Sequence, residues 1–185
     1  MEKKHPDVET VIVTGDKDAF QLVRGKTTVV TPISGYTKVV RYNREAVKEK
    51  MGVWPEQVPD YKGLCGDSSD NIPGVKGIGE KTAIKLLEAF GSVEGIYEHI
   101  EAVEPERIRE LLRANEKEAR LCKHVATILR EDGISLDLNA CAVHNFDMSR
   151  ARTNFARFGF RSLLVRLEKL NTGWDGRREE QGSLF

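Results

Sequence analysis

The spacing of apolar residues along the chain changes near residue 54. Val11-Ile12-Val13 is a short apolar run that predicts a buried strand. Residues 27–32 and 37–42 predict two more strands, and Ser34-Gly35 between them favours a β-hairpin turn. From Pro55 onward, apolar residues recur at helical spacing. The pattern therefore predicts an α/β region followed by a mostly α-helical region.

Several helix boundaries are predicted by residues that start or stop helices. A short helix is expected over residues 17–23, and Asn43 is expected to cap another that runs to about residue 51. Pro55 begins the next helix, which ends near residue 63. Gly91 ends a helix over residues 80–90, and Ser92 caps residues 93–100.

The second half of the chain is also predicted to be helical. A long helix begins at Pro105, with a possible break near Asn115, and its candidate core positions are Ile108, Leu111, Leu112, Ala119, Leu121, Cys122 and Val125. Residues 134–138 are predicted to be extended, and helices are expected over residues 148–158, capped by Asp147, and 162–170. Residues 171–185 are polar and broken by glycine, which predicts a disordered tail.

Composition narrows the possible classes of protein. The 185 residues are 39% apolar and carry no formal net charge, so no overall electrostatic attraction to nucleic acid is expected. Residues 148–170 nevertheless hold six basic residues against one acidic residue, which fits either a DNA-contacting surface or a solvated helix face. The three cysteines lack metal-site spacing, which favours reduced thiols in a cytosol. No secretory signal or membrane span is predicted.

Residues 66–83 combine two chemistries in one segment. Asp67 and Asp70 offer carboxylate oxygens, which hard metal ions prefer. A turn containing Gly74, Gly77 and Gly79 then leads into a helix, whose free amide groups suit a phosphate. Helix, glycine hairpin and helix form the pattern of a helix-hairpin-helix element that holds DNA by its phosphates. The alternative is a plain turn before a capped helix.

A second pair of carboxylates follows the first predicted strand. Asp16 and Asp18 come directly after Thr14-Gly15, at the carboxyl end of residues 11–13. Ligands bind at such strand ends in open α/β sheets, and Mg²⁺ or Mn²⁺ would suit these oxygens. Asp16 taken alone could instead cap the helix that follows. Together, Asp16, Asp18, Asp67 and Asp70 predict a divalent-metal site.

These two motifs resemble the 5′→3′ exonuclease domain of bacterial DNA polymerase I and the flap endonucleases. The matching segments are Thr14-Gly15-Asp16-Lys17-Asp18 and residues 66–83. The resemblance implies that the four aspartates form part of a carboxylate cluster for divalent metal ions. It also implies a K⁺ site made by the backbone carbonyls of Leu64, Cys65, Pro73, Val75 and Ile78. The expected DNA-binding residues are Gly74, Lys76, Gly77, Gly79, Lys81, Thr82 and Lys85.

The resemblance also implies an organisation and a function. Residues 1–54 would be the last part of a Rossmann-like or PIN-like nuclease sheet, residues 55–170 a helical exonuclease domain, and residues 171–185 a tail. The family's first strand, basic arch and remaining acidic cluster are not found before Asp16. We therefore expect a DNA-binding part of a 5′→3′ exonuclease or flap endonuclease that is inactive or weak alone. The alternative is a non-catalytic DNA-binding module.

The last five residues suggest a further partner. Gln181, Leu184 and Phe185 resemble the short peptide with which bacterial replication and repair proteins bind the sliding clamp. A random ending is the alternative. The expected partners are thus DNA at 5′ ends, flaps or duplex, and the clamp, with no membrane. The expected location is the bacterial cytoplasm, with the nucleoid.

Overall fold

A computed structural model describes residues 5–34, 38–130, 136–142 and 147–174. The chain forms two compact units, Met1–Arg130 and Glu131–Phe185. This division differs from the boundaries that the sequence suggests near residues 54 and 170.

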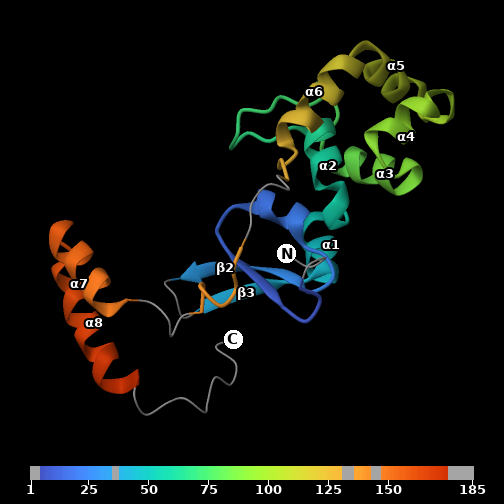
Figure 1. The fold of residues 1–185 in the computed structure, drawn as a ribbon. Coiled ribbons are helices and arrows are strands. Elements are labelled where there is room, and N and C mark those ends of the chain that lie inside the picture. The colour runs from blue at the N-terminus through green and yellow to red at the C-terminus, as the bar shows by residue number, and fades with distance from the viewer. Residues whose placement is uncertain (1–4, 35–37, 131–135, 143–146, 175–185) are drawn as a thin grey trace. The chain divides into compact units, whose positions relative to one another are not determined.

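The first unit begins with a small mixed sheet (Figure 1). Strand β1 (Thr10–Val13) pairs in parallel with β2 (Thr27–Ser34), which pairs antiparallel with β3 (Lys38–Tyr42), so the order is β1-β2-β3. The three predicted strands are confirmed, but β1 is not buried as predicted: Thr10, Val11 and Ile12 are half-buried, and Val13 is 61% exposed. Ser34 is the last residue of β2, whereas Gly35 and Thr37 lie outside the described residues. The 3-10 helix η1 (Lys17–Leu22) lies between β1 and β2 in the sequence.

Helices and the loops that join them follow the sheet in the first unit. They are α1 (Arg44–Met51), η2 (Pro55–Gln57), α2 (Val58–Cys65), α3 (Glu80–Phe90), α4 (Val93–Glu98), η3 (Ile100–Ala102), α5 (Glu106–Ala114) and α6 (Glu116–Ala126). The predicted caps are confirmed: Asn43 accepts a hydrogen bond from the amide of Ala46, and Ser92 accepts one from Gly95. Helix α2 runs two residues beyond its predicted end, and Asn115 separates α5 from α6 as expected.

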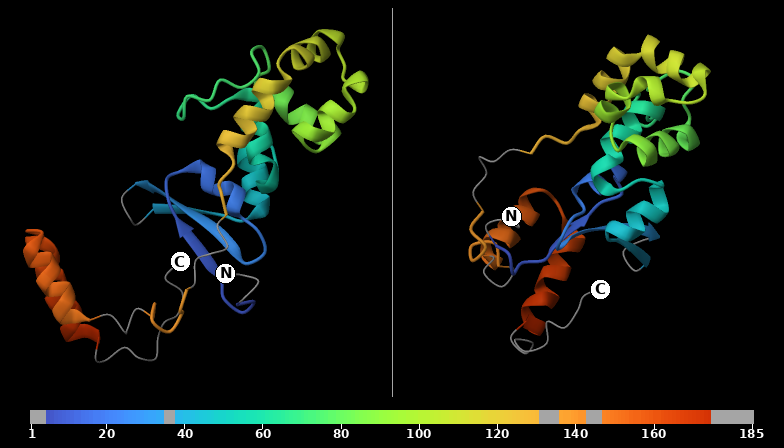
Figure 2. Two further views of the ribbon diagram at one scale, coloured as in Figure 1. Left: turned by 45° about the horizontal axis from the view of Figure 1, so that its top comes forward. Right: turned by 90° about the vertical axis from the view of Figure 1, so that its right-hand side faces the viewer.

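Helix α2 connects the two regions of the first unit (Figure 2). It contacts η1 next to the sheet and also contacts α3, α4 and α6. One hydrophobic core continues through these contacts and contains Phe20, Val29, Val58, Leu64, Leu87 and Leu112. The α2–α6 packing is close at Gly63, where a β-carbon would lie 2.9 Å from the β-carbon of Lys123. The sheet and helices therefore share one core.

Two predicted core positions are wrong. Leu121 is 55% exposed and Val125 is 63% exposed, although both have helical spacing from apolar neighbours. Because α6 is a separate helix, its buried stripe consists of Ala119, Cys122 and Ala126. Leu121 and Val125, four residues apart, lie on another face of the helix.

The second unit contains two helices that pack against each other, α7 (Met148–Arg157) and α8 (Arg161–Trp174). Asp147 caps α7, as predicted, by accepting a hydrogen bond from the amide of Arg150. Helix α8 continues to Trp174, so the disorder predicted from residue 171 is wrong for residues 171–174. Residues 136–138 form no strand, which corrects the described part of the predicted extended segment. No described helix is both long and apolar enough to span a membrane.

Candidate metal and nucleic-acid site

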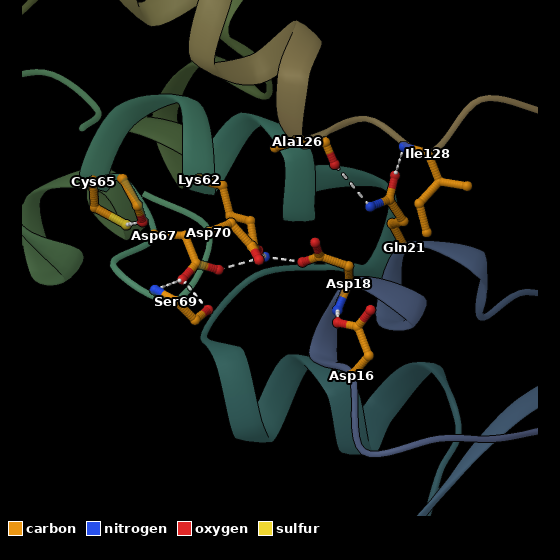
Figure 3. Close-up of polar contacts among 11 residues, drawn as sticks. Asp16, Asp18, Gln21, Lys62, Cys65, Asp67, Ser69, Asp70, Ala126 and Ile128 are labelled. Atoms are coloured by element: carbon orange, nitrogen blue, oxygen red, sulfur yellow. Dashed lines mark hydrogen bonds and ion pairs between the residues drawn. The ribbon is translucent and has the colours of Figure 1, made fainter. Parts of the chain in front are cut away.

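Three carboxylates from two distant segments converge in the first unit (Figure 3). Asp18 lies on η1, whereas Asp67 and Asp70 lie in the loop after α2. One ligand oxygen from each lies within 4.8 Å of the others. Asp18 and Asp67 are half-buried, and Asp70 is exposed. Three carboxylate oxygens at this spacing are the type of donor that hard divalent cations prefer.

Asp16 has a different local role in this structure. Its Oδ1 accepts a hydrogen bond of 2.9 Å from the amide of Asp18, which makes Asp16 the N-cap of η1. Its own amide donates to the hydroxyl oxygen of Thr14. This is the capping alternative recognised in the sequence. Asp16 therefore orients the segment that carries Asp18, and it lies outside the converging group of three.

A tight loop fixes the direction of Asp67. Asp67 and Ile72 exchange two backbone hydrogen bonds, each of 2.8 Å, which closes the loop on itself. The carboxylate of Asp67 also accepts hydrogen bonds from the amide and the hydroxyl of Ser69, at 2.9 and 2.5 Å. Gly66 enters this loop with φ of +78°, and a β-carbon there would lie 2.6 Å from the carbonyl oxygen of Ile72. Glycine is required because both the torsion and the space exclude a side chain.

Sequence reasoning missed Lys62, whose ammonium lies among the three carboxylates. Lys62 is only 4% exposed. Its Nζ contacts Asp18 directly and lies 2.5 Å from Oδ2 of Asp67 and 3.5 Å from Oδ2 of Asp70. Burial raises the pKa of Asp67, but hydrogen bonds from Lys62 and Ser69 outweigh it and lower that pKa to about 2. The sequence signal that could have indicated Lys62 is the position of a lysine between the apolar residues Tyr61 and Leu64.

The glycine turn follows the carboxylate loop and is held against the end of α2. The amide of Val75 donates to the carbonyl of Leu64 at 2.8 Å, and the amide of Ile78 donates to the carbonyl of Val75 at 2.9 Å. Gly74 has φ of +64°, and a β-carbon there would lie 2.3 Å from the amide nitrogen of Gly66. The carboxylate loop and the glycine turn are therefore packed backbone to backbone.

The predicted DNA-binding residues extend from this turn into α3. Gly77 has φ of +95°, and Gly79 is the N-cap of α3, which has no side-chain cap. Lys76, Lys81 and Lys85 are exposed and Thr82 is half-buried. Of the five carbonyls predicted to hold K⁺, those of Leu64, Cys65, Pro73, Val75 and Ile78, two accept the hydrogen bonds described above. The predicted clamp-binding residues Gln181, Leu184 and Phe185 lie outside the described residues.

Comparison with known proteins identifies the family of this chain. A family model described as 5′-3′ exonuclease, C-terminal SAM fold, matches residues 53–149, and the chain belongs to this family. DNA polymerase I of Bacillus subtilis is 45% identical over 159 residues, which cover 86% of this chain and 18% of that protein. DNA polymerase I of Bacillus caldotenax is 42% identical over 160 residues, with the same coverage of 86% and 18%.

Solved structures share the fold. The phage T5 5′-exonuclease with bound zinc is 24% identical, with a TM-score of 0.57 over 64% of this chain and 42% of that chain. A phage T5 flap endonuclease in a pseudo-enzyme–product complex with DNA and metal ions is 23% identical, with a TM-score of 0.58. That match covers 66% of this chain and 44% of the other. The present chain thus spans less than a fifth of its curated relatives and under half of these structures.

Proposed function

We propose that this chain supplies the DNA-holding part and three metal ligands of a 5′→3′ exonuclease or flap endonuclease. The observation that carries the proposal is the convergence of Asp18, Asp67 and Asp70 beside a glycine turn that leads into α3. A metal site next to a phosphate-binding turn is the combination that phosphodiester hydrolysis requires. Membership in the exonuclease family supports the same proposal.

Each group has a defined part in the proposed chemistry. Asp18, Asp67 and Asp70 would hold Mg²⁺ or Mn²⁺, with Asp16 acting through water or through its cap of η1. The bound ion would activate water and offset charge on the scissile phosphate. Backbone amides at the start of α3 would bind a neighbouring phosphate, with Lys81 and Lys85 adding charge. These contacts would place a DNA strand without reading its sequence.

The proposal also includes a K⁺ ion bound at the glycine turn. The amide of Val75 donates to the carbonyl of Leu64, which holds the glycine turn against the end of α2. A carbonyl oxygen has two lone pairs, so accepting one amide leaves room for a cation. K⁺ there would bridge the turn to a DNA phosphate. Replacing K⁺ by Li⁺ at constant ionic strength should then weaken binding to DNA.

Metal and DNA binding test the proposal directly on the 185-residue chain. Calorimetric titration with MnCl₂ should show binding that Asp18→Asn and Asp67→Asn each weaken. Duplex binding should weaken with salt, and Lys81→Ala should lower affinity and reduce the salt slope by about one. Lys117→Ala is the matched control, because Lys117 is an exposed lysine on α6. Equal effects of the two lysines would remove α3 from the proposed interface.

The second candidate function is a DNA-binding module without metal chemistry. Lys62 favours it, because its ammonium already balances part of the carboxylate charge. DNA binding that depends on Lys81, together with no detectable Mn²⁺ binding, would support this candidate. Metal-dependent cleavage of a labelled 5′-flap substrate that Asp67→Ala abolishes would exclude it.

The proposal also covers the C-terminal residues and the place of the protein in the cell. Residues Gln181, Leu184 and Phe185 would tether the protein to a sliding clamp in the cytoplasm, near chromosomal DNA. A peptide of residues 177–185 should bind the clamp of the same organism, and replacing Leu184 and Phe185 by alanine should abolish this binding. No binding of the wild-type peptide would refute the contact.

A further inference from the structure

Lys62 is a buried cation that joins both halves of the proposed metal site (Figure 3). Its side chain is 5% exposed and extends from α2 toward Asp18 on η1 and toward Asp67 and Asp70 on the following loop. Lysine is almost never buried in proteins unless it is paired. Here the pairing crosses 44 residues of sequence, from Asp18 to Lys62. The ammonium therefore ties the sheet region to the helical region at the site itself.

Charge balance explains why a cation is needed at this point. Three carboxylates share a small volume, so their negative charges repel one another. The ammonium of Lys62 supplies one positive charge against three negative charges. Pairing matters here because a charge that is buried without a partner destabilises the folded protein. Lys62 thus stabilises the arrangement of carboxylates when they hold no metal ion.

A divalent ion held by the three carboxylates would occupy the position that the ammonium of Lys62 occupies. Nζ lies 2.5 Å from Asp67 Oδ2 and 3.5 Å from Asp70 Oδ2, close to the point on which the ligand oxygens converge. Mg²⁺ binds oxygen at about 2.0–2.1 Å, so an ion shared by these oxygens would overlap the ammonium. Two cations at such a distance also repel each other.

We infer that Lys62 is an internal counterion that a divalent metal ion displaces, and that it thereby sets the affinity of the site for metal. This inference rests on the proposed function, because it assumes that Asp18, Asp67 and Asp70 bind a divalent ion. The lysine stem is flexible, and its four methylenes allow Nζ to withdraw when the ion enters. Lys62 is accordingly a positioning residue for the carboxylates and a competitor of the metal.

The experiment compares Lys62→Met and Lys62→Gln with the wild-type chain. Methionine keeps an unbranched stem without charge, and glutamine keeps a polar end if the methionine variant fails to fold. The exposed Lys117 on α6 provides the charge control Lys117→Met. Titration calorimetry with MnCl₂ at constant ionic strength measures the Kd, and circular dichroism measures the thermal midpoint with and without Mn²⁺.

Loss of the Lys62 charge should change the thermal midpoint and the affinity for Mn²⁺ in opposite directions. Without Mn²⁺, the Lys62 variants should melt below wild type, because three carboxylates then lack their cation. With Mn²⁺, they should bind about tenfold to a hundredfold more tightly and gain more stability than wild type. Lys117→Met should match wild type in both. Variants that unfold without Mn²⁺ and regain helical signal with it would also support the inference.

Failure of the counterion inference and failure of the proposed metal site give different results. Equal or weaker Mn²⁺ binding by both Lys62 variants, with normal binding by wild type, would overturn the counterion inference and leave the proposed metal site intact. No Mn²⁺ binding by any of the proteins would overturn the inference and the proposed metal site together.

Discussion

Removing the positive charge of Lys123 should destabilise the packing of α2 against α6 by an amount that depends on pH. Nζ of Lys123 lies 2.6 Å from Oδ1 of Asp60 and 2.5 Å from Oε2 of Glu94. Asp60 also accepts a hydrogen bond of 2.7 Å from the amide of Val93, so one carboxylate connects α2, α4 and α6. The Asp60 side chain is 7% exposed and that of Lys123 is 23% exposed.

The structure gives the size of the effect. Removing one partner of a fully buried ion pair costs about 3–5 kcal/mol, because the other charge is left unpaired. Water can reach Lys123 in part, and the pair with the half-exposed Glu94 adds only about 0–1 kcal/mol. We therefore expect Lys123→Met to lower the free energy of unfolding by about 2–4 kcal/mol at pH 7. With an m-value of about 2 kcal/mol/M, the urea midpoint should fall by about 1–2 M.

The direction of the pH dependence follows from Asp60. Burial raises the pKa of Asp60, and hydrogen bonds from Lys123 and Val93 only partly oppose this rise. Without Lys123, the folded-state pKa of Asp60 should rise further above its value in the unfolded chain. A group with a raised folded-state pKa contributes stability below the unfolded pKa and loses it as the pH rises. The deficit of Lys123→Met should therefore shrink as the pH falls from 7 toward 4.

Urea unfolding followed by circular dichroism tests this reasoning with one control. Asp60→Asn keeps an oxygen for the amide of Val93 but removes the buried charge. The double variant Asp60→Asn/Lys123→Met should consequently be more stable than Lys123→Met alone at pH 7. A variant Lys123→Met with wild-type stability, or with a deficit that does not change between pH 7 and pH 4, would refute the assignment.

Three further measurements test other contacts. Gly63→Ala should destabilise by about 1–3 kcal/mol in thermal unfolding, because the new methyl group meets the backbone oxygen of Ala119 at 3.0 Å; wild-type stability would disprove close α2–α6 contact. Gly74→Ala should disrupt the glycine turn and weaken DNA binding in a fluorescence anisotropy assay, whereas unchanged affinity would place the DNA elsewhere. Hydrogen exchange should be faster in β1, which among the described strands pairs only with β2, than in α2; equal protection would contradict this expectation.

Local signals in the sequence predicted most element boundaries. Asn43, Ser92 and Asp147 cap their helices through short side chains that reach nearby amides, so their effect can be recognised from a few residues. The aspartates at residues 67 and 70 could be recognised for the same reason, since they share one short loop with the glycine turn.

Long-range packing decided what the sequence did not predict. Leu121 and Val125 have helical spacing, but the face that α6 buries is set by its contact with α2. Asp16 and Asp18 look equivalent in sequence, yet the cap at η1 directs only Asp18 toward the loop after α2. In the sequence, Lys62 belongs to no recognisable motif. Its partner on η1, Asp18, comes close to it only when the chain folds.

The burial of α2 has a consequence for how the protein tolerates sequence variation. Every residue from Val58 to Leu64 is buried, in a helix of eight residues. A surface helix usually alternates between sensitive and permissive positions with a period of 3.6. In a saturation-mutagenesis screen, α2 should instead form a continuous block in which almost no position accepts a change of size or charge, without helical periodicity. Amino-acid substitutions should therefore accumulate more slowly in α2 than in the other described helices of the first unit.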